Sequence, residues 1–576
     1  MSLGPQCWRC RKRRLRCDSS LPSCLKCALA SVSCPGYAPT RPIAWRNPLL
    51  LTSHGIVRVR ENGAHEKAGL GRASVMGIVC RAPRSVRSEV ELRIAADAIE
   101  YCGYSSLPTY LDHIPPGGTD GFCTDNLHVA PDLVPYATER SPYQISPSEI
   151  GELAEYVRKS YISIAALHRF VSGEPAGVAG PRGMVRSAAP TPEGSDISEL
   201  MAAGDFKSVH FASQAAAIRA LSEELGKHQA DQNGAGAGPE ILLGIMLMLS
   251  SQIQYSAYAP WQAHIHGAWS LIAAQGGMEV LAKANTDLCR VLQQVAVVDI
   301  FGMSTHCLTE ASAKTVLSRY TCYAMIFDES MVEIANPWTL MPNGLARTIN
   351  QINMLRAENL LLPSIESRTQ GLLAVLEFLD AASPDAWATE VATNATVWLA
   401  PGRLSDDVET RTAWTALMTA FLNATVLYAI NSLAGLGETS LRAVASSQDL
   451  MSSLVWRESA AYDALMSSIR ILFDQRAQRR ETQDLKSDPP ATSAGLLHKF
   501  VIWPMVVGGI QAAFVRRDDE AAGYLCSGMQ SIGEELGTVS MIDGARLVEK
   551  LGQAHRNGDE PTSWDALFDG APLFLM

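Results

Sequence analysis

The 576-residue sequence predicts a mostly all-α protein with a small cysteine-rich module at its N-terminus. Three observations lead to this prediction. Six cysteines fall within the first 34 residues. From about residue 140 onward, apolar residues recur at helical spacing, and strand-like alternation is nearly absent. Apolar residues make up 47% of the chain and charged residues 19%, which is typical of globular rather than disordered protein.

The cysteines form two matching halves, each with the pattern C-x2-C-x6-C. They are Cys7, Cys10, Cys17, Cys24, Cys27 and Cys34. Thiolates two residues apart are typical zinc ligands. Six thiolates are too many for one tetrahedral ion and too few for two separate ions, but they suffice for two Zn²⁺ if two sulfurs bridge. The twofold pattern makes Cys7 and Cys24 the predicted bridging pair.

The two six-residue spacers between the cysteines differ in charge. The first spacer holds five cations, Arg11, Lys12, Arg13, Arg14 and Arg16, and the second has no charge. A cationic arm suits a short helix that lies against DNA, because duplex DNA carries one charge per roughly 1.7 Å of axis. We expect no signal peptide ahead of the cysteines and find no βαβ pattern, which disfavours a disulfide framework and a thioredoxin-like site. A zinc module that binds protein rather than DNA stays open.

Residues 7–37 resemble the fungal binuclear zinc-cluster DNA-binding domain, the family of the yeast galactose regulator. The resemblance implies that the six cysteines hold two zinc ions and that the module reads a CGG-type triplet. It also implies that Arg13 and Arg14 contact bases, while Arg11 and Arg16 lie near phosphates. Family members often have lysine where this chain has Arg13 and Arg14, and arginine can pair with guanine through two hydrogen bonds.

Three segments follow from composition: a cluster module over residues 1–40, a flexible linker over 41–85 and a helical body over 86–576. The linker is predicted from its abundance of Pro and Gly. The stretch 86–101 has helical spacing but no sustained heptad, so we expect the first helix of the body there and no dimerising coiled coil.

The body is predicted to be helical throughout. Ser146-Pro147-Ser148-Glu149 is a capping box and predicts a helix that begins there. Further helices are expected over residues 206–225, 239–258, 261–275, 286–308, 312–328, 345–360, 366–381, 408–434, 440–473, 495–515, 518–535 and 541–554. Polar or Gly/Pro-rich stretches predict mobile loops at 173–196, 229–239 and 476–494. The most apolar segment, 241–249, is about half the roughly 18 residues of a membrane span, so we expect no membrane.

Residues 261–277 carry the pattern W-x2-H-x2-G-A-x2-L-I followed by G-G. This pattern resembles the regulatory domain of one large branch of the same fungal factors, which implies an all-α array that modulates activity. On a helix, His264 and His266 point about 200° apart, so both are predicted to pack in the core rather than share a metal. No HExxH, P-loop or GxSxG motif occurs, so the chain is predicted not to be an enzyme.

Charge is distributed unevenly along the chain. Residues 1–48 contain nine Lys or Arg and one acid, a net charge of +8, which leaves −19 on the rest of a chain whose total is −11. A basic head on an acidic body is the layout of a DNA-binding protein whose body avoids DNA. The basic run also suits a nuclear import signal, so the nucleus is the expected location.

The tail, residues 559–575, interleaves acids with bulky apolar side chains. This composition suits an activation segment that folds on a coactivator. We favour a last helix that docks on the body, because Trp564 and Phe568 are i,i+4 neighbours.

The sequence as a whole predicts a nuclear, sequence-specific, DNA-binding regulator of RNA polymerase II genes. Its expected partners are double-stranded DNA, a coactivator or corepressor, and a second copy bound through the helical body. One alternative is a zinc-containing interaction or corepressor protein that never reads bases. The other is a ligand-sensing helical protein whose zinc arm is auxiliary.

Overall fold

The computed structural model describes most of the body and little of the N-terminal region. The described residues are 27, 92, 94–96, 98, 153–173, 197, 200, 205–230, 238–284, 286–327, 340–389, 408–437, 441, 447–483, 494–558, 563–569 and 573–574. The chain divides into two compact units, residues 1–70 and 71–576. Within the described ranges the second unit is helical and contains no strand, which confirms the all-α class.

The second unit is a series of helices joined by short turns and by segments outside the described ranges. In chain order they are α6 (Glu155–Gly173), α8 (Phe206–Ala230), α9 (Gly238–Tyr255), α10 (Trp261–Ala274), α11 (Met278–Ala284), α12 (Thr286–Ser304), α13 (Glu310–Ile326), α14 (Asn343–Leu361), α15 (Ile365–Ala381), α17 (Val408–Leu433), α19 (Gln448–Gln483), η2 (Ala494–Phe500), α20 (Ile502–Ile510), η3 (Gln511–Arg516), α21 (Asp519–Glu535), α22 (Ser540–Arg556) and η4 (Asp565–Phe568).

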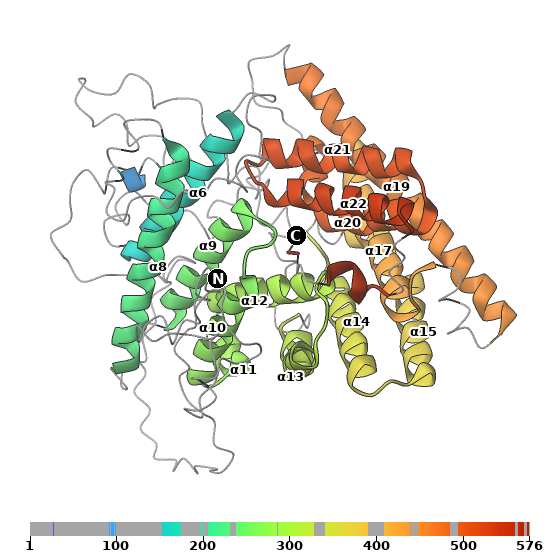
Figure 1. Ribbon diagram of the computed structural model, residues 1–576, viewed down its shortest axis with the longest axis horizontal. Helices are drawn as coiled ribbons and strands as arrows, with labels where there is room; N and C mark the ends of the chain where they lie inside the picture. Colours follow the sequence, from blue (N-terminus) through green and yellow to red (C-terminus); the bar gives the residue numbers. More distant parts are fainter. Residues whose placement is uncertain are drawn as a thin grey trace, which may run out of the picture. The chain divides into compact units, whose positions relative to one another are not determined.

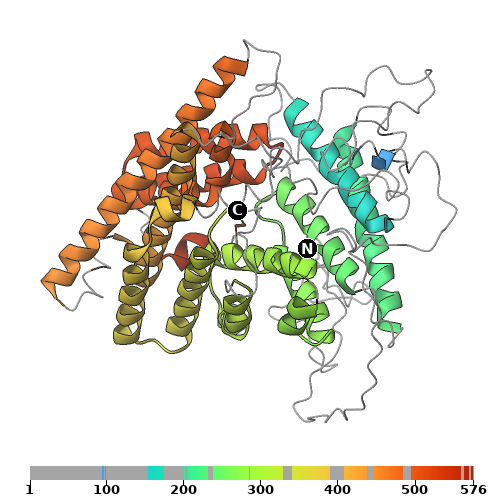
Figure 2. The same ribbon diagram turned by 180° about the vertical axis from the view of Figure 1, so that it is seen from behind.

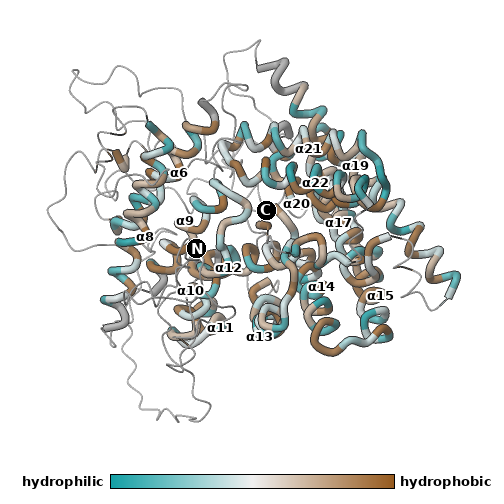
Figure 3. The backbone as a smooth tube through the Cα atoms, in the orientation of Figure 1, coloured by the Kyte–Doolittle hydropathy of each residue, from teal (hydrophilic) through white to brown (hydrophobic). Residues whose placement is uncertain are grey.

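Helices that are neighbours in this series pack against one another. The main pairs are α6 with α8, α13 with α14, α17 with α19, and α21 with α22 (Figures 1 and 2). Helix α9 contacts α6, α8, α10 and α12, and α17 contacts α14, α15, α19 and α20. These contacts join the pairs through one continuous apolar core. Along α8 and α19, hydrophilic and hydrophobic residues are mixed (Figure 3).

The described residues near position 95 also belong to this core. Leu92, Ile94, Ala95, Ala96 and Ala98 are helical, and Ala95 and Ala98 are buried in the same apolar cluster as the body helices. These residues confirm helical structure within 86–101, and the place of this helix as the first of the body stays a prediction.

Helix α17 corrects the expectation that no segment approaches a membrane span. Residues Arg411–Leu433 are long and apolar enough to cross a bilayer by length and composition, but 78% of the apolar window is buried inside the protein. The reason is packing, because four other helices surround α17 and leave it little solvated face. We therefore interpret α17 as a core helix.

The start of α6 was predicted too early. The helix begins at Glu155, while Leu153 and Ala154 lie outside it. The capping box at residues 146–149 lies outside the described residues, and the helix predicted to begin there does not continue into α6. Two described residues that are not helical, Leu153 and Ala154, thus precede α6.

Helix α19 extends into a region predicted to be a loop. It runs to Gln483, whereas a loop was expected from residue 476. Where the loop was expected to begin, Gln475 donates to the carbonyl of Glu409 (3.1 Å) and Arg476 pairs with Glu535 (2.7 Å). Polar composition suggested a loop here, but the helix continues past these contacts to Gln483. Helices α8 and α9 likewise reach Ala230 and Gly238, inside the predicted 229–239 loop.

The single helix predicted over 495–515 is instead three pieces: the 3₁₀ turn η2, α20 and the π-helical η3. Pro504 explains the first break, since a residue without an N–H cannot donate to the carbonyl four residues earlier and is tolerated only in a helix's first turn. The short helix α11 was missed. Gly276 and Gly277 end α10 with φ near +98° and +97°, and the N–H of Gly277 donates to the carbonyl of Ile272 (2.9 Å).

Candidate functional site

The predicted DNA-binding module lies almost entirely outside the described residues. This applies to Arg11, Lys12, Arg13, Arg14 and Arg16, and to five of the six cysteines, Cys7, Cys10, Cys17, Cys24 and Cys34. Cys27 is described as helical and 1% exposed. Cysteine is a residue type that suits zinc, because thiolates select this ion, and burial of Cys27 excludes competing water from its thiol.

The described part of the chain offers no alternative metal site. In the residues that the structure describes, no group of three or more His, Cys, Asp or Glu side chains could hold a metal ion. Three described cysteines of the body, Cys307, Cys322 and Cys526, are free thiols. Burial raises the pKa of the Cys526 thiol to about 12, which keeps it protonated and unreactive.

The motif of residues 261–277 forms α10 and the turn after it. Trp261 is fully buried and packs on Gly302 of α12, where a Cβ atom would lie 2.5 Å from the indole ring. His264 is 3% exposed, its Nε2 lies 2.8 Å from Oε1 of Gln252, and burial lowers its pKa to about 4. His266 is exposed on the other face of the helix. Core packing was therefore predicted correctly for His264 and wrongly for His266.

A buried polar network fixes α10 against α12 and α13. Trp269 donates from Nε1 to the hydroxyl of Tyr323 (2.7 Å), and Tyr323 donates to Oδ2 of Asp299 (2.6 Å). Arg319 donates to the same carboxylate oxygen (2.6 Å) and lies 5.0 Å from the Trp269 ring centre. Burial beside Asp299 raises the pKa of Tyr323 well above its ordinary value, so the hydroxyl stays protonated and remains a donor. The motif thus serves to position helices.

The C-terminal tail docks on the body, which is the outcome that the sequence analysis favours. Trp564 is 1% exposed and donates from Nε1 to the carbonyl of Ser304 (2.7 Å). Asp565 pairs with Arg356 (2.8 Å), whose side chain is 1% exposed. Phe568 lies against Trp564 with ring centres 5.6 Å apart. The residue pair Arg356 and Asp565 was not predicted, because its members lie far apart in the sequence.

The last described residues continue this docking beyond η4. The N–H of Phe574 donates to the carbonyl of Ala257 (2.7 Å), at the corner between α9 and α10. The Phe574 ring also packs on Trp261, with centres 5.8 Å apart. The tail therefore connects the α10 motif, α12 and α14 within one core.

Comparison with known families agrees with this architecture. Residues 126–566 match the fungal specific transcription factor domain, and residues 6–42 match the fungal Zn(2)-Cys(6) binuclear cluster domain. Because the first match spans more than half of the chain, this protein belongs to that family. It is a fungal transcription regulator with a zinc-binding, DNA-binding cluster domain at its N-terminus.

Two curated relatives are similar to this chain over very different lengths. The phomenoic acid biosynthesis cluster-specific transcriptional regulator of Leptosphaeria maculans is 22% identical over 581 residues, covering 99% of this chain and 89% of that protein. The acriflavine sensitivity control protein acr-2 of Neurospora crassa is 55% identical over 31 residues, which is 5% of each chain. No solved structure matches this chain.

Proposed function

We propose that this protein is a nuclear regulator of RNA polymerase II genes that reads CGG-type triplets in the major groove. One observation carries the proposal: five cations fill the spacer between the second and third cysteines of a C-x2-C-x6-C repeat. A zinc module that only bound protein would have no reason to concentrate charge on one of its two arms. The family match over residues 6–42 supports the proposal.

The cluster in this proposal holds two Zn²⁺ ions per chain. Its ligands are Cys7, Cys10, Cys17, Cys24, Cys27 and Cys34, with Cys7 and Cys24 each bridging both ions. Zinc supplies folding free energy that so short a segment could not obtain from a hydrophobic core. The buried, helical Cys27 fits a ligand role.

The cations divide into two roles. Arg13 and Arg14 reach the bases, where a guanidinium pairs with O6 and N7 of guanine and sets specificity. Arg11, Lys12 and Arg16 neutralise phosphates and supply affinity that falls as salt rises. The acidic remainder of the chain, with a net charge of −19 against +8 for residues 1–48, is repelled by the duplex.

One cluster reads only about three base pairs, so useful specificity requires a second reading module. We propose that the helical body supplies it by holding two copies together, with a coactivator or corepressor as a further partner of the body. The relative from Leptosphaeria maculans aligns over 99% of this chain and is named a regulator of one biosynthesis cluster. By this similarity, we propose that the present chain also controls a biosynthetic gene set.

Arginine replacement tests the proposed roles. Arg14→Ala should weaken binding to the best site by about 1–3 kcal/mol and flatten the preference at one guanine. Arg16→Ala, its matched control within the same arm, should weaken binding to all sequences alike. The measurement is competition binding of the full-length protein to specific and random duplexes. Equal losses on both duplexes for both variants would refute the assignment of base reading to Arg14.

A further inference from the structure

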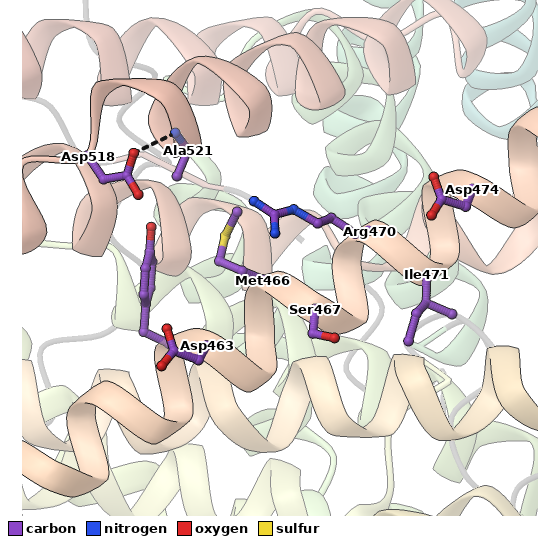
Figure 4. Close-up of a pocket in the computed structure, with 9 residues that line it drawn as sticks. Asp463, Met466, Ser467, Arg470, Ile471, Asp474, Asp518 and Ala521 are labelled. Carbon is purple, nitrogen blue, oxygen red and sulfur yellow. Dashed lines mark hydrogen bonds between the residues drawn. The ribbon is translucent and has the colours of Figure 1, made fainter.

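The surface between α19 and the start of α21 is hollowed into a cleft of about 380 Å³ (Figure 4). One face of α19, from Tyr462 to Asp474, forms most of its wall, and Asp518 and Ala521 close the other side. Its volume lies at the lower end of the range for small-molecule pockets. The size suits a small metabolite.

One side chain of the cleft lining carries a buried hydroxyl group that has no partner among the described residues. Tyr462 is 6% exposed, and its hydroxyl makes no hydrogen bond to any described residue. Arg516 lies over the ring, 5.4 Å from its centre. Burial raises the pKa of Tyr462 to about 12, and its protonated hydroxyl keeps a hydrogen that no described residue accepts. A buried hydroxyl without a partner decreases the stability of the folded protein, and a bound ligand that accepts its hydrogen bond would remove this cost.

The charged groups around the cleft are not paired with one another. Arg470 makes no ion pair with a described carboxylate, and Figure 4 shows its guanidinium directed toward Asp518 and Met466 and away from Asp474. Asp463 and Asp474 are exposed on the rim. Three carboxylates and one guanidinium thus belong to the lining, which offers both acidic and basic contacts.

The backbone beside the cleft is held in an unusual conformation. The π-helical η3 leads to Arg517, which has a left-handed φ of 59°, and then to Asp518, which caps α21 by accepting from the N–H of Ala521 (2.9 Å). Gln511 fixes η3 by donating to Glu458 (2.9 Å) and accepting from Asn431 (2.8 Å). π-Helical turns occur often at functional sites. Here the turn places Asp518 opposite α19 on a rigid support.

We propose that this cleft binds a small organic amine that also carries a carboxylate, a ligand of the amino-acid class. Its carboxylate accepts hydrogen bonds from Tyr462 and Arg470, and its ammonium group pairs with Asp463 or Asp518. Three carboxylates in the lining outnumber Arg470 and the neighbouring Arg516, so a second ammonium group on the ligand is favoured. This site lies outside the N-terminal cluster, so ligand binding there would act on the helical body and not on base recognition itself.

Calorimetric titration of the full-length protein tests the site with three matched probes. L-lysine carries both groups, 1,5-diaminopentane lacks the carboxylate, and hexanoate lacks both amines. Lysine should bind, and each of the other two should bind at least about tenfold more weakly. Absence of lysine binding, or equal binding of all three probes, would overturn the proposal.

Two variants show whether lysine occupies this cleft. Tyr462→Phe and Arg470→Gln should each weaken lysine binding by about tenfold or more. Tyr462→Phe removes a hydroxyl without a partner, so its melting temperature without ligand should stay the same or rise. Matched controls are Tyr258→Phe and Arg347→Gln, which change exposed residues elsewhere and should bind lysine as the wild type does. Wild-type affinity in both cleft variants would place lysine elsewhere and refute the site.

Discussion

Docking of the C-terminal tail gives a quantitative prediction. Trp564→Ala removes an indole that is 1% exposed, packs 5.3 Å from the ring centre of Tyr428 and donates to the carbonyl of Ser304. Truncating a buried Trp costs about 3–5 kcal/mol, because apolar contact is lost and a cavity remains. That is a large share of the roughly 5–15 kcal/mol that stabilises a typical protein. We therefore expect a clear fall in the urea concentration at which half of the protein is unfolded. Far-ultraviolet circular dichroism measures this midpoint.

The chain offers a matched control for this experiment. Trp456 on α19 is 69% exposed, so Trp456→Ala should change the free energy of unfolding by no more than about 0.5 kcal/mol. If Trp564→Ala behaved like Trp456→Ala, the tail would not be docked in solution. The alternative interpretation, an activation segment that folds only on a coactivator, would then be favoured.

Three further predictions concern packing, pH and zinc. Gly302→Ala should destabilise the protein by about 1–3 kcal/mol, because the added Cβ would lie 2.5 Å from the Trp261 ring. The control Gly523→Ala places its Cβ in open space on α21 and should stabilise the protein by about 0.5–1 kcal/mol. Urea unfolding measures both free energies. Burial lowers the pKa of His210 in the folded protein to about 4. As the pH falls from about 6.5 to 4, the unfolded chain therefore takes up a proton at His210 that the folded protein does not, and the free energy of unfolding should decrease. His210→Gln should reduce that slope, and an unchanged slope would contradict the assignment. Native mass spectrometry should find two zinc ions per chain and none after Cys7→Ser; a single zinc in the wild type would rule out the bridged cluster.

Most helices of the body were predictable because helix-forming, apolar-rich segments are long and are separated by polar or Gly/Pro-rich stretches, whereas the short α11 was missed. Predictions failed where distant contacts decide the structure. Arg476, where a loop was expected to begin, is helical and pairs with Glu535, and nothing within the local sequence identifies that partner. The π turn at η3 likewise depends on Gln511 meeting Asn431 and Glu458 from two other helices.

The two candidate sites differ in how they could be found. The cysteine module is encoded locally, since metal ligands and cations recur at fixed short spacing and identify the family from a few residues. The cleft on α19 has no such signature. Tyr462 and Arg470 lie on one helix, but Asp518 joins them only because η3 and Arg517 turn the chain back toward α19. Sequence periodicity describes single helices and does not predict which of them meet.

The central claim is that the N-terminal cluster reads bases. The most direct measurement is selection of the zinc-loaded, full-length protein on a randomised duplex library. We predict that selected sequences are enriched in CGG-type triplets, and that enrichment is lost with Cys7→Ser and is weakened at one guanine with Arg14→Ala. Selected sequences with no base preference, bound with the same salt dependence as random DNA, would contradict the claim and favour a zinc module that binds protein.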